Sequence, residues 1–121
     1  MRVLIADDQS SVRSALRLLL EQDSEVHIVD EVDNCSDLLA QVEEHCPDLI
    51  LLDWELPGQR TTKLLPALRA RCPNLFVVAL SGRPEARNAA LGAGVDFFVS
   101  KGDAPERLLA AVVDCRRTNT L

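Results

Sequence analysis

Five short apolar runs, each ended by polar residues, constrain the fold of this chain more than any other feature of its sequence. Val, Ile and Leu are common in these runs, which lie near residues 3–6, 26–32, 49–52, 75–80 and 95–99. Continuous apolar runs of this length are typical of strands that are buried on both faces of a sheet. Between the runs lie longer segments in which apolar residues recur at helical spacing, as at Val12, Leu16 and Leu19.

Five strands that alternate with five helices predict an α/β fold, a doubly wound parallel sheet with helices on both faces. The crossovers between parallel strands are then right-handed. In such sheets the functional site lies beyond the carboxyl ends of the strands, near the point where the strand order reverses. A chain of 121 residues suits one compact domain, so we expect residues 1–121 to form a single domain.

Local signals indicate where the helices begin and how tightly they pack. Ser10 or Ser11 is expected to cap the first helix, and Asp103 is expected to cap the last. Pro66 is harmless only in a first turn, so the third helix should start late, near Lys63; a kink is the alternative. The fourth helix is rich in alanine, which buries little area, so it should dock loosely.

Polar residues stand where four of the predicted strands end. Asp7 and Asp8 follow the first strand, Asp53 the third, Ser81 the fourth, and Lys101 comes just after the fifth. The carboxyl ends of parallel strands meet at one edge of a sheet. Three carboxylates, one hydroxyl and one ammonium group are therefore expected to converge there.

This combination of groups suits phosphoryl chemistry assisted by a metal ion. Converging carboxylates repel one another unless a cation joins them, and oxygen ligands of this kind suit Mg²⁺. Lys101 would add a positive charge, and Ser81 could donate a hydrogen bond to a phosphoryl oxygen. Asp53 stands alone after the most apolar run and is the best candidate for a nucleophile that forms an aspartyl phosphate. Asp7 and Asp8 are better placed to hold the metal.

The same residues, with others between them, resemble the receiver domains of two-component response regulators. The resemblance rests on Asp7-Asp8, on Asp53 followed by Leu56-Pro57-Gly58, on Ser81-Gly82, on Ala93-Gly94-Val95-Asp96, and on Phe98 three residues before Lys101. It covers about residues 2–117, and its elements are weak singly but highly specific in this order. The resemblance implies a flavodoxin-like fold of five strand–helix units with the strand order 2-1-3-4-5.

The resemblance also implies how the site works. Asp53 would accept a phosphoryl group from a sensor histidine kinase. Asp8 would bind Mg²⁺ directly, Asp7 would assist, and Asp53 and the backbone carbonyl of Glu55 would complete the protein ligands. Lys101 would contact the phosphoryl group. Enzyme activity would be limited to phosphorylation and dephosphorylation of the chain's own aspartate.

A conformational switch is implied as well. Ser81 would shift towards the phosphoryl group, and Phe98 would turn inwards as Ser81 moves. That movement would alter the face made by the fourth helix, the fifth strand and the fifth helix, and a homodimer through this face is a hypothesis. Many members of the family have a proline with a cis peptide bond after the lysine. Gly102 stands there in this chain, so we expect a trans bond.

The charge of the chain bears on its partners. The net charge of −6 argues against a nucleic-acid-binding surface on this chain. The segment from Ser100 to Leu108 resembles receivers that precede a helix-turn-helix module. We therefore expect DNA to be reached only through a C-terminal domain that is not in this chain, so that the switch controls transcription.

Neither a signal peptide nor an apolar run long enough for a membrane span is expected, which favours a cytoplasmic location. The four cysteines are Cys35, Cys46, Cys72 and Cys115, and no two of them have Cys-x-x-Cys spacing. Zinc and thioredoxin-like sites are therefore weak interpretations, and free thiols in a reducing cytosol are expected.

Three rival functions compete with the switch. A phosphatase or phosphotransferase would need a substrate pocket, which short loops disfavour. A flavin or nucleotide site would need a Gly-rich or Ser/Thr-rich loop after the first strand, where Asp7 and Asp8 stand instead. A degenerate receiver that acts as a phosphorylation-independent interaction module is the main alternative, although its usual mark, the loss of a site residue, is missing.

Overall fold

The computed structural model describes residues 1–58 and 61–119. Within these residues, five parallel strands form one sheet in the order β2-β1-β3-β4-β5. The strands are β1 (Arg2–Ala6), β2 (His27–Val32), β3 (Leu49–Asp53), β4 (Phe76–Ser81) and β5 (Phe97–Ser100). The predicted α/β class and the strand order that the resemblance implied are both confirmed.

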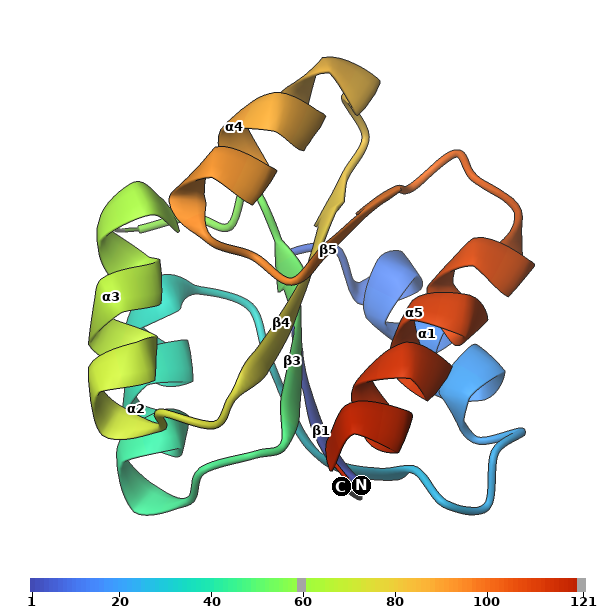
Figure 1. Ribbon diagram of the computed structural model, residues 1–121, viewed down its shortest axis with the longest axis horizontal. Helices are drawn as coiled ribbons and strands as arrows, with labels where there is room; N and C mark the ends of the chain where they lie inside the picture. The colour runs from blue at the N-terminus through green and yellow to red at the C-terminus, as the bar shows by residue number, and fades with distance from the viewer. Residues whose placement is uncertain (59–60, 120–121) are drawn as a thin grey trace.

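Helices cover both faces of the sheet (Figure 1). They are α1 (Ser10–Leu20), α2 (Cys35–Glu44), α3 (Thr61–Arg71), α4 (Arg87–Ala93) and α5 (Pro105–Asn119), and a short 3-10 helix, η1 (Pro84–Ala86), precedes α4. In the view of Figure 1, α2, α3 and α4 lie to the left of the sheet, and α1 and α5 lie to its right. A hydrophobic core therefore lies on each face of the sheet, between the strands and the helices.

The central strand β3 shows why the apolar runs are continuous. Ile50 and Leu52 belong to the core under α2, α3 and α4, whereas Leu49 and Leu51 belong to the core under α1 and α5. Successive side chains of a strand point to opposite faces, and all four of these side chains are 0% exposed. Burying one such side chain stabilises the fold by about 2 kcal/mol, so the strand has no position for a polar side chain before its end.

The first and last helices begin differently from the expectation. Gln9, not Ser10 or Ser11, occupies the cap position of α1, and its side chain makes no capping hydrogen bond. Asp103 lies two residues before α5, too early to cap it, and its Oδ2 accepts a hydrogen bond from the Ser100 N–H at 3.0 Å. The predicted caps are wrong because a short polar side chain can equally well bond the turn that precedes a helix.

The predicted late start of the third helix is also wrong. The helix α3 begins at Thr61, so Pro66 lies inside it and removes the hydrogen bond to the carbonyl four residues earlier. Leu64, Leu65 and Leu68 of this helix are at most 1% exposed. The burial of three leucines outweighs the loss of one backbone hydrogen bond.

The helix α4 packs on the sheet through small side chains, as its alanine content predicts. Ala90 is its buried residue, and the side chain of Leu91 is 37% exposed. The helix ends at Ala93 and is capped by Gly94, whose φ of +107° lies in the left-handed region that glycine adopts without strain. A helix that buries so little area can shift at a small cost in free energy.

The cysteines differ from the expectation of free thiols. Cys46 and Cys72 form a disulfide, whereas Cys35 and Cys115 are buried thiols. Cys46 lies just beyond α2 and Cys72 just beyond α3, and these helices cover the same face of the sheet. The two residues, 26 positions apart, are therefore brought together by the fold, and spacing rules for local motifs do not detect such a pair.

Two further expectations concern the backbone and the membrane. No peptide bond between described residues is cis, so the bond that follows Lys101 is trans, as expected. In the same part of the chain, every helix is too short or too polar to cross a membrane.

Candidate functional site

Three aspartates meet where the strand order reverses. Asp7 and Asp8 follow β1, and Asp53 is the last residue of the neighbouring strand β3. One carboxylate oxygen from each of the three residues lies within 4.8 Å of the others. The structure thus brings together the carboxylates that the sequence placed at two strand ends, at the usual position of a functional site in such a sheet.

Asp53 is held in a buried and anionic environment. Its side chain is 2% exposed, its Oδ1 accepts a hydrogen bond from the Glu55 N–H at 3.0 Å, and Oδ1 lies 3.6 Å from Lys101 Nζ. Burial, with a further contribution from the negative charge of Asp7, raises the pKa of Asp53 to about 6, although the Glu55 N–H and Lys101 oppose this shift. The ionised carboxylate is therefore costly here unless more positive charge is nearby.

Asp7 is fully buried, and its two carboxylate oxygens differ. Oδ1 accepts a hydrogen bond from the Gln9 N–H at 2.9 Å. Oδ2 lies 2.8 Å from Lys101 Nζ, yet it makes no aligned hydrogen bond. Burial lowers the pKa of Lys101, but its contacts with Asp7 and Asp53 outweigh that effect and raise it, so the ammonium group stays charged.

The aspartate cluster fits a small divalent cation. Asp7 Oδ2 is a buried oxygen with an unused acceptor capacity, and the carboxylate of the exposed Asp8 is open to solvent and to ligands. Hard cations such as Mg²⁺ bind carboxylate oxygens together with water molecules. Lys101 contacts two of the three clustered carboxylates, those of Asp7 and Asp53, so an additional cation would reduce the repulsion among the three.

Ser81 is the last residue of β4 and is fully buried. Its Oγ–H points to the carboxylate of Glu55, with distances of 2.8 Å to Oε1 and 3.1 Å to Oε2. The same Oγ accepts a hydrogen bond from the Arg83 N–H at 3.0 Å. A hydroxyl group has one proton to donate, so Ser81 must leave Glu55 before it can donate to another oxygen.

Phe98 lies in β5, and its side chain is 9% exposed and packs in the core under α2, α3 and α4. This residue is therefore part of the core and sits one strand away from Ser81, since β4 and β5 are paired. A core position is compatible with the switch role that the resemblance implies for Phe98.

Two contacts at the site escaped the sequence analysis. The side chain of Glu55 accepts a hydrogen bond from Ser81, a partner that the sequence did not indicate. The guanidinium group of Arg13, from the first turns of α1, donates a hydrogen bond to the Asp7 carbonyl at 2.7 Å. Spacing along the sequence does not indicate either contact, because each joins segments that only the fold brings together.

Comparison with known proteins fits this geometry. The sequence profile described as the response regulator receiver domain matches residues 3–113. The chain belongs to this family. Receiver domains of this family are found in transcriptional regulators, as the relatives of this chain show.

Two curated relatives illustrate the relationship. The transcriptional activator protein ExaE of Pseudomonas putida is 34% identical over 93% of this receiver domain and 53% of its own length. The phosphate regulon transcriptional regulatory protein PhoB of Klebsiella pneumoniae is 30% identical over 92% of this chain and 49% of its own length. The chain spans about half the length of the curated relatives it matches.

Solved structures show the same fold. The signal receiver domain of the putative response regulator NarL from Mycobacterium tuberculosis superposes with a TM-score of 0.84 at 28% identity, and the match covers 96% of this chain and 95% of that one. The isolated REC domain of RcsB from Salmonella enterica serovar Typhimurium, in the presence of the phosphomimetic BeF3⁻, gives a TM-score of 0.88 at 25% identity. That match covers 97% of this chain and 88% of the RcsB chain.

Proposed function

We propose that this receiver domain is a phosphorylation-dependent switch whose phosphoacceptor is Asp53. The observation that carries the proposal is the surroundings of this residue. Asp53 is a buried carboxylate at the end of the central strand, and Asp7, Asp8 and Lys101 lie around it. We extend the proposal to residues 1–121 as a single receiver domain, of which residues 59–60 and 120–121 lie outside the described structure.

The proposed donor is the phosphohistidine of a sensor histidine kinase. An oxygen of the Asp53 carboxylate attacks the phosphorus atom, the bond between phosphorus and the imidazole nitrogen breaks, and that nitrogen takes up a proton. Lys101 is placed to stabilise the added negative charge. Asp7, Asp8, Asp53 and the backbone carbonyl of Glu55 would hold Mg²⁺, which would supply charge neutralisation at the phosphoryl oxygens. The chemistry is confined to the domain's own aspartate.

The proposed switch starts at Ser81. Its hydroxyl group is bound to Glu55 in this structure, and a phosphoryl group on Asp53 would offer a more strongly charged acceptor. As Ser81 moves, Phe98 on the neighbouring strand would turn inwards. The loosely packed helix α4 would then shift, and the surface formed by α4, β5 and α5 would change.

The proposed output is transcription. The curated relatives are transcriptional regulators about twice as long as this chain, and one structural neighbour is RcsB bound to a promoter. We propose that this domain controls a DNA-binding domain that is not in this chain, in a regulator that works in the cytoplasm. The net charge of −6 supports the inference that the chain itself does not bind DNA.

The fluorescence of Trp54 tests the switch. Trp54 is the sole tryptophan in the sequence and directly follows Asp53. We expect a saturable change in its emission when Mg²⁺ is titrated, and a further change when acetyl phosphate, a small phosphodonor, is added. Intact-mass analysis should then show one phosphoryl adduct.

The Asp53→Ala variant is the control for this experiment, and it should lose the response to acetyl phosphate. A wild-type chain that shows neither a fluorescence response nor a phosphoryl adduct would overturn the proposal. In that case the alternative, a degenerate receiver that acts as a phosphorylation-independent interaction module, would be the better description.

A further inference from the structure

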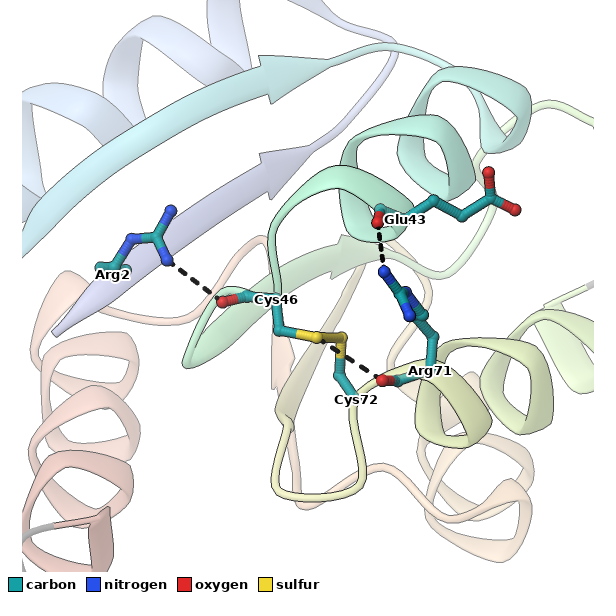
Figure 2. Close-up of a disulfide and its surroundings, with 5 residues drawn as sticks. All are labelled: Arg2, Glu43, Cys46, Arg71 and Cys72. Carbon is teal, nitrogen blue, oxygen red and sulfur yellow. Dashed lines mark hydrogen bonds between the residues drawn. A yellow bond between two sulfur atoms is a disulfide. The ribbon is translucent and has the colours of Figure 1, made fainter.

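A second group of reactive side chains lies at the opposite edge of the sheet from Asp53. The disulfide between Cys46 and Cys72 joins the segments that follow α2 and α3, with its Cα atoms 5.7 Å apart (Figure 2). Cys46 precedes the start of β3, whereas Asp53 ends it, so the strand separates the two sites by on the order of 16 Å. The disulfide therefore has no part in the chemistry at Asp53.

The two residues of this disulfide differ in their access to solvent. Cys46 is exposed, whereas Cys72 is 3% exposed. An exchange reaction begins when a thiolate reaches a disulfide sulfur, and access decides which sulfur is attacked. The structure therefore favours attack at Cys46, with Cys72 as the sulfur that leaves.

Two arginines lie near Cys46, in a segment that also carries the acidic residues Glu43, Glu44 and Asp48. The guanidinium group of Arg2 donates a hydrogen bond to the Cys46 carbonyl at 3.3 Å, and that of Arg71 donates one to the Glu43 carbonyl at 2.6 Å. Figure 2 shows both arginines on the two sides of the disulfide. A guanidinium group has five N–H donors, so both arginines can also pair with the carboxylates of a small thiol such as glutathione.

The remaining cysteines do not compete for such reagents. Cys35 and Cys115 are both buried. Burial, with the negative charges of Asp96 and Asp114, raises the pKa of Cys115 to about 12, so its thiol is unreactive at neutral pH. Thiol reagents that act on the folded domain are thus directed to one place.

We propose that Cys46 and Cys72 form a reversible redox site that exchanges with low-molecular-weight thiols and disulfides of the glutathione class. In the reducing direction, a thiolate attacks Cys46 Sγ, the bond between the two protein sulfurs breaks, and Cys72 leaves and takes up a proton. A second thiolate attacks the mixed disulfide and releases Cys46 and the oxidised small disulfide. Two small thiols are oxidised while the protein disulfide is reduced to two thiols, and the reverse reaction restores it.

The expected consequence is a change in the stability of the α2–α3 layer. The disulfide closes a loop with a sequence separation of 26 that contains β3 and α3. A cross-link of this length restricts the unfolded chain, and its reduction should lower the melting temperature by roughly 10 °C. The redox state of the cell would then set how firmly these two helices are joined.

The test uses the whole chain in mixtures of reduced and oxidised glutathione. Folded protein is alkylated with N-ethylmaleimide and its intact mass is measured, so that each accessible thiol adds one label. We expect label to appear on Cys46 as reduced glutathione increases, with the same midpoint when the titration is run in either direction. A disulfide that persists in the folded protein under a large excess of reduced glutathione overturns the proposal, and so do thiols that persist in oxidised glutathione.

Two matched variants test which sulfur reacts. With oxidised glutathione, Cys72→Ala should form one glutathione adduct because Cys46 remains exposed, whereas Cys46→Ala should form none because Cys72 is buried. Circular dichroism confirms that both variants fold. The Cys46→Ala variant should also melt at the temperature of the reduced wild type, independently of added reductant. Adducts of equal yield on both variants would contradict the assignment of Cys46 as the reactive sulfur.

Discussion

The buried environment of Asp53 disfavours the negative charge of its ionised carboxylate. Its pKa is raised from 3.8 to about 6, chiefly by burial and then by Asp7. A carboxyl group with a raised pKa keeps its proton longer in the folded state than in the unfolded state. The folded state therefore loses stability as the pH rises from 3.8 to about 6, and the loss is complete above that range.

The Asp53→Asn substitution removes this cost. Without divalent cations and above about pH 6, Asp53 is ionised in both the folded and the unfolded wild type. Under these conditions Asp53→Asn should raise the free energy of unfolding by roughly 1–3 kcal/mol. Urea unfolding with and without Mg²⁺ measures the effect. Added Mg²⁺ should stabilise the wild type and the variant much less. A variant that is less stable than the wild type in metal-free buffer would show that the buried charge is compensated in some other way.

Glu55 offers a second prediction for a single residue. Its carboxylate accepts the hydrogen bond from Ser81 Oγ–H and adds negative charge near the place where the phosphoryl group would bind. Removing this acceptor in Glu55→Ala should speed phosphorylation by acetyl phosphate about fivefold, the effect of ~1 kcal/mol. The rate of appearance of the phosphoryl adduct measures this change.

The Ser81→Ala background separates the two possible causes of that effect. If Glu55 acts by holding the hydroxyl group, Glu55→Ala should change the rate little once Ser81 is replaced. An equal acceleration in both backgrounds would mean that the charge of Glu55 alone matters.

At the scale of elements, two loops depend on glycine for different reasons. Gly58 has a φ of +118°, and a Cβ atom there would lie 3.0 Å from Cys35 Cβ, in the first turn of α2. Gly94 has a φ of +107° but faces open space. A residue other than glycine would be strained at either position. At Gly58, in the loop after β3, its side chain would also be crowded by Cys35.

The substitutions Gly58→Ala and Gly94→Ala form a matched pair. Each should lose about 1 kcal/mol from backbone strain, and Gly58→Ala should lose a further ~1–3 kcal/mol from overpacking. Urea unfolding midpoints measure the difference. Equal losses would mean that Cys35 can move aside at little cost.

Arg69 of α3 links three elements. Its guanidinium group donates hydrogen bonds to the Leu75 carbonyl at 3.1 Å, to the Gly94 carbonyl at 2.8 Å and to Asp96 Oδ2 at 3.0 Å. The same Asp96 oxygen accepts a hydrogen bond from the Val77 N–H at 2.8 Å. The motif that ends in Asp96 therefore joins α3, β4 and the turn before β5.

The Arg69→Ala substitution should cost about 1–2 kcal/mol because three acceptors lose a partly buried donor. Arg83→Ala is the control, since Arg83 forms an exposed ion pair with Glu85 and should change stability by less than ~0.5 kcal/mol. Thermal unfolding compares the two variants. A similar loss of stability in both variants would mean that the three hydrogen bonds of Arg69 contribute no more than an exposed ion pair.

For the whole molecule, the open prediction is dimer formation through the face of α4, β5 and α5. This face carries a groove of about 380 Å³, which is lined by residues that include Arg87, Leu91, Phe97 and Arg107. We expect light scattering to show a monomer that becomes a dimer when Mg²⁺ and beryllofluoride, a phosphoryl mimic, are added. A monomer under both conditions would rule out this hypothesis.

Two exposed leucines provide the control for the dimer interface. Leu91 lies on α4 and is 37% exposed, whereas Leu18 lies on α1 and is 69% exposed. Leu91→Glu should prevent the dimer, and Leu18→Glu should leave it unchanged. If Leu18→Glu prevents the dimer and Leu91→Glu does not, the interface lies on the face of α1 and α5.

The order of residues along the chain was enough to predict the sheet and the edge that carries the aspartates. Continuous apolar runs identify buried parallel strands, and the residue that follows each run must lie at the carboxyl edge of the sheet. Asp7, Asp53 and Ser81 could be assigned to one edge for this reason. Helix starts were less accurate, because caps such as Ser10 compete with other local hydrogen bonds that differ little in free energy.

Only the tertiary structure decided which side chains face each other across loops. Three features depend on distances of a few ångströms between separate segments. They are the disulfide between Cys46 and Cys72, the hydrogen bond from Ser81 to Glu55, and the position of Asp7 Oδ2 beside Lys101. A periodic pattern specifies the direction in which a side chain leaves its own strand or helix. It does not specify how two loops approach, because packing of the whole chain sets that distance.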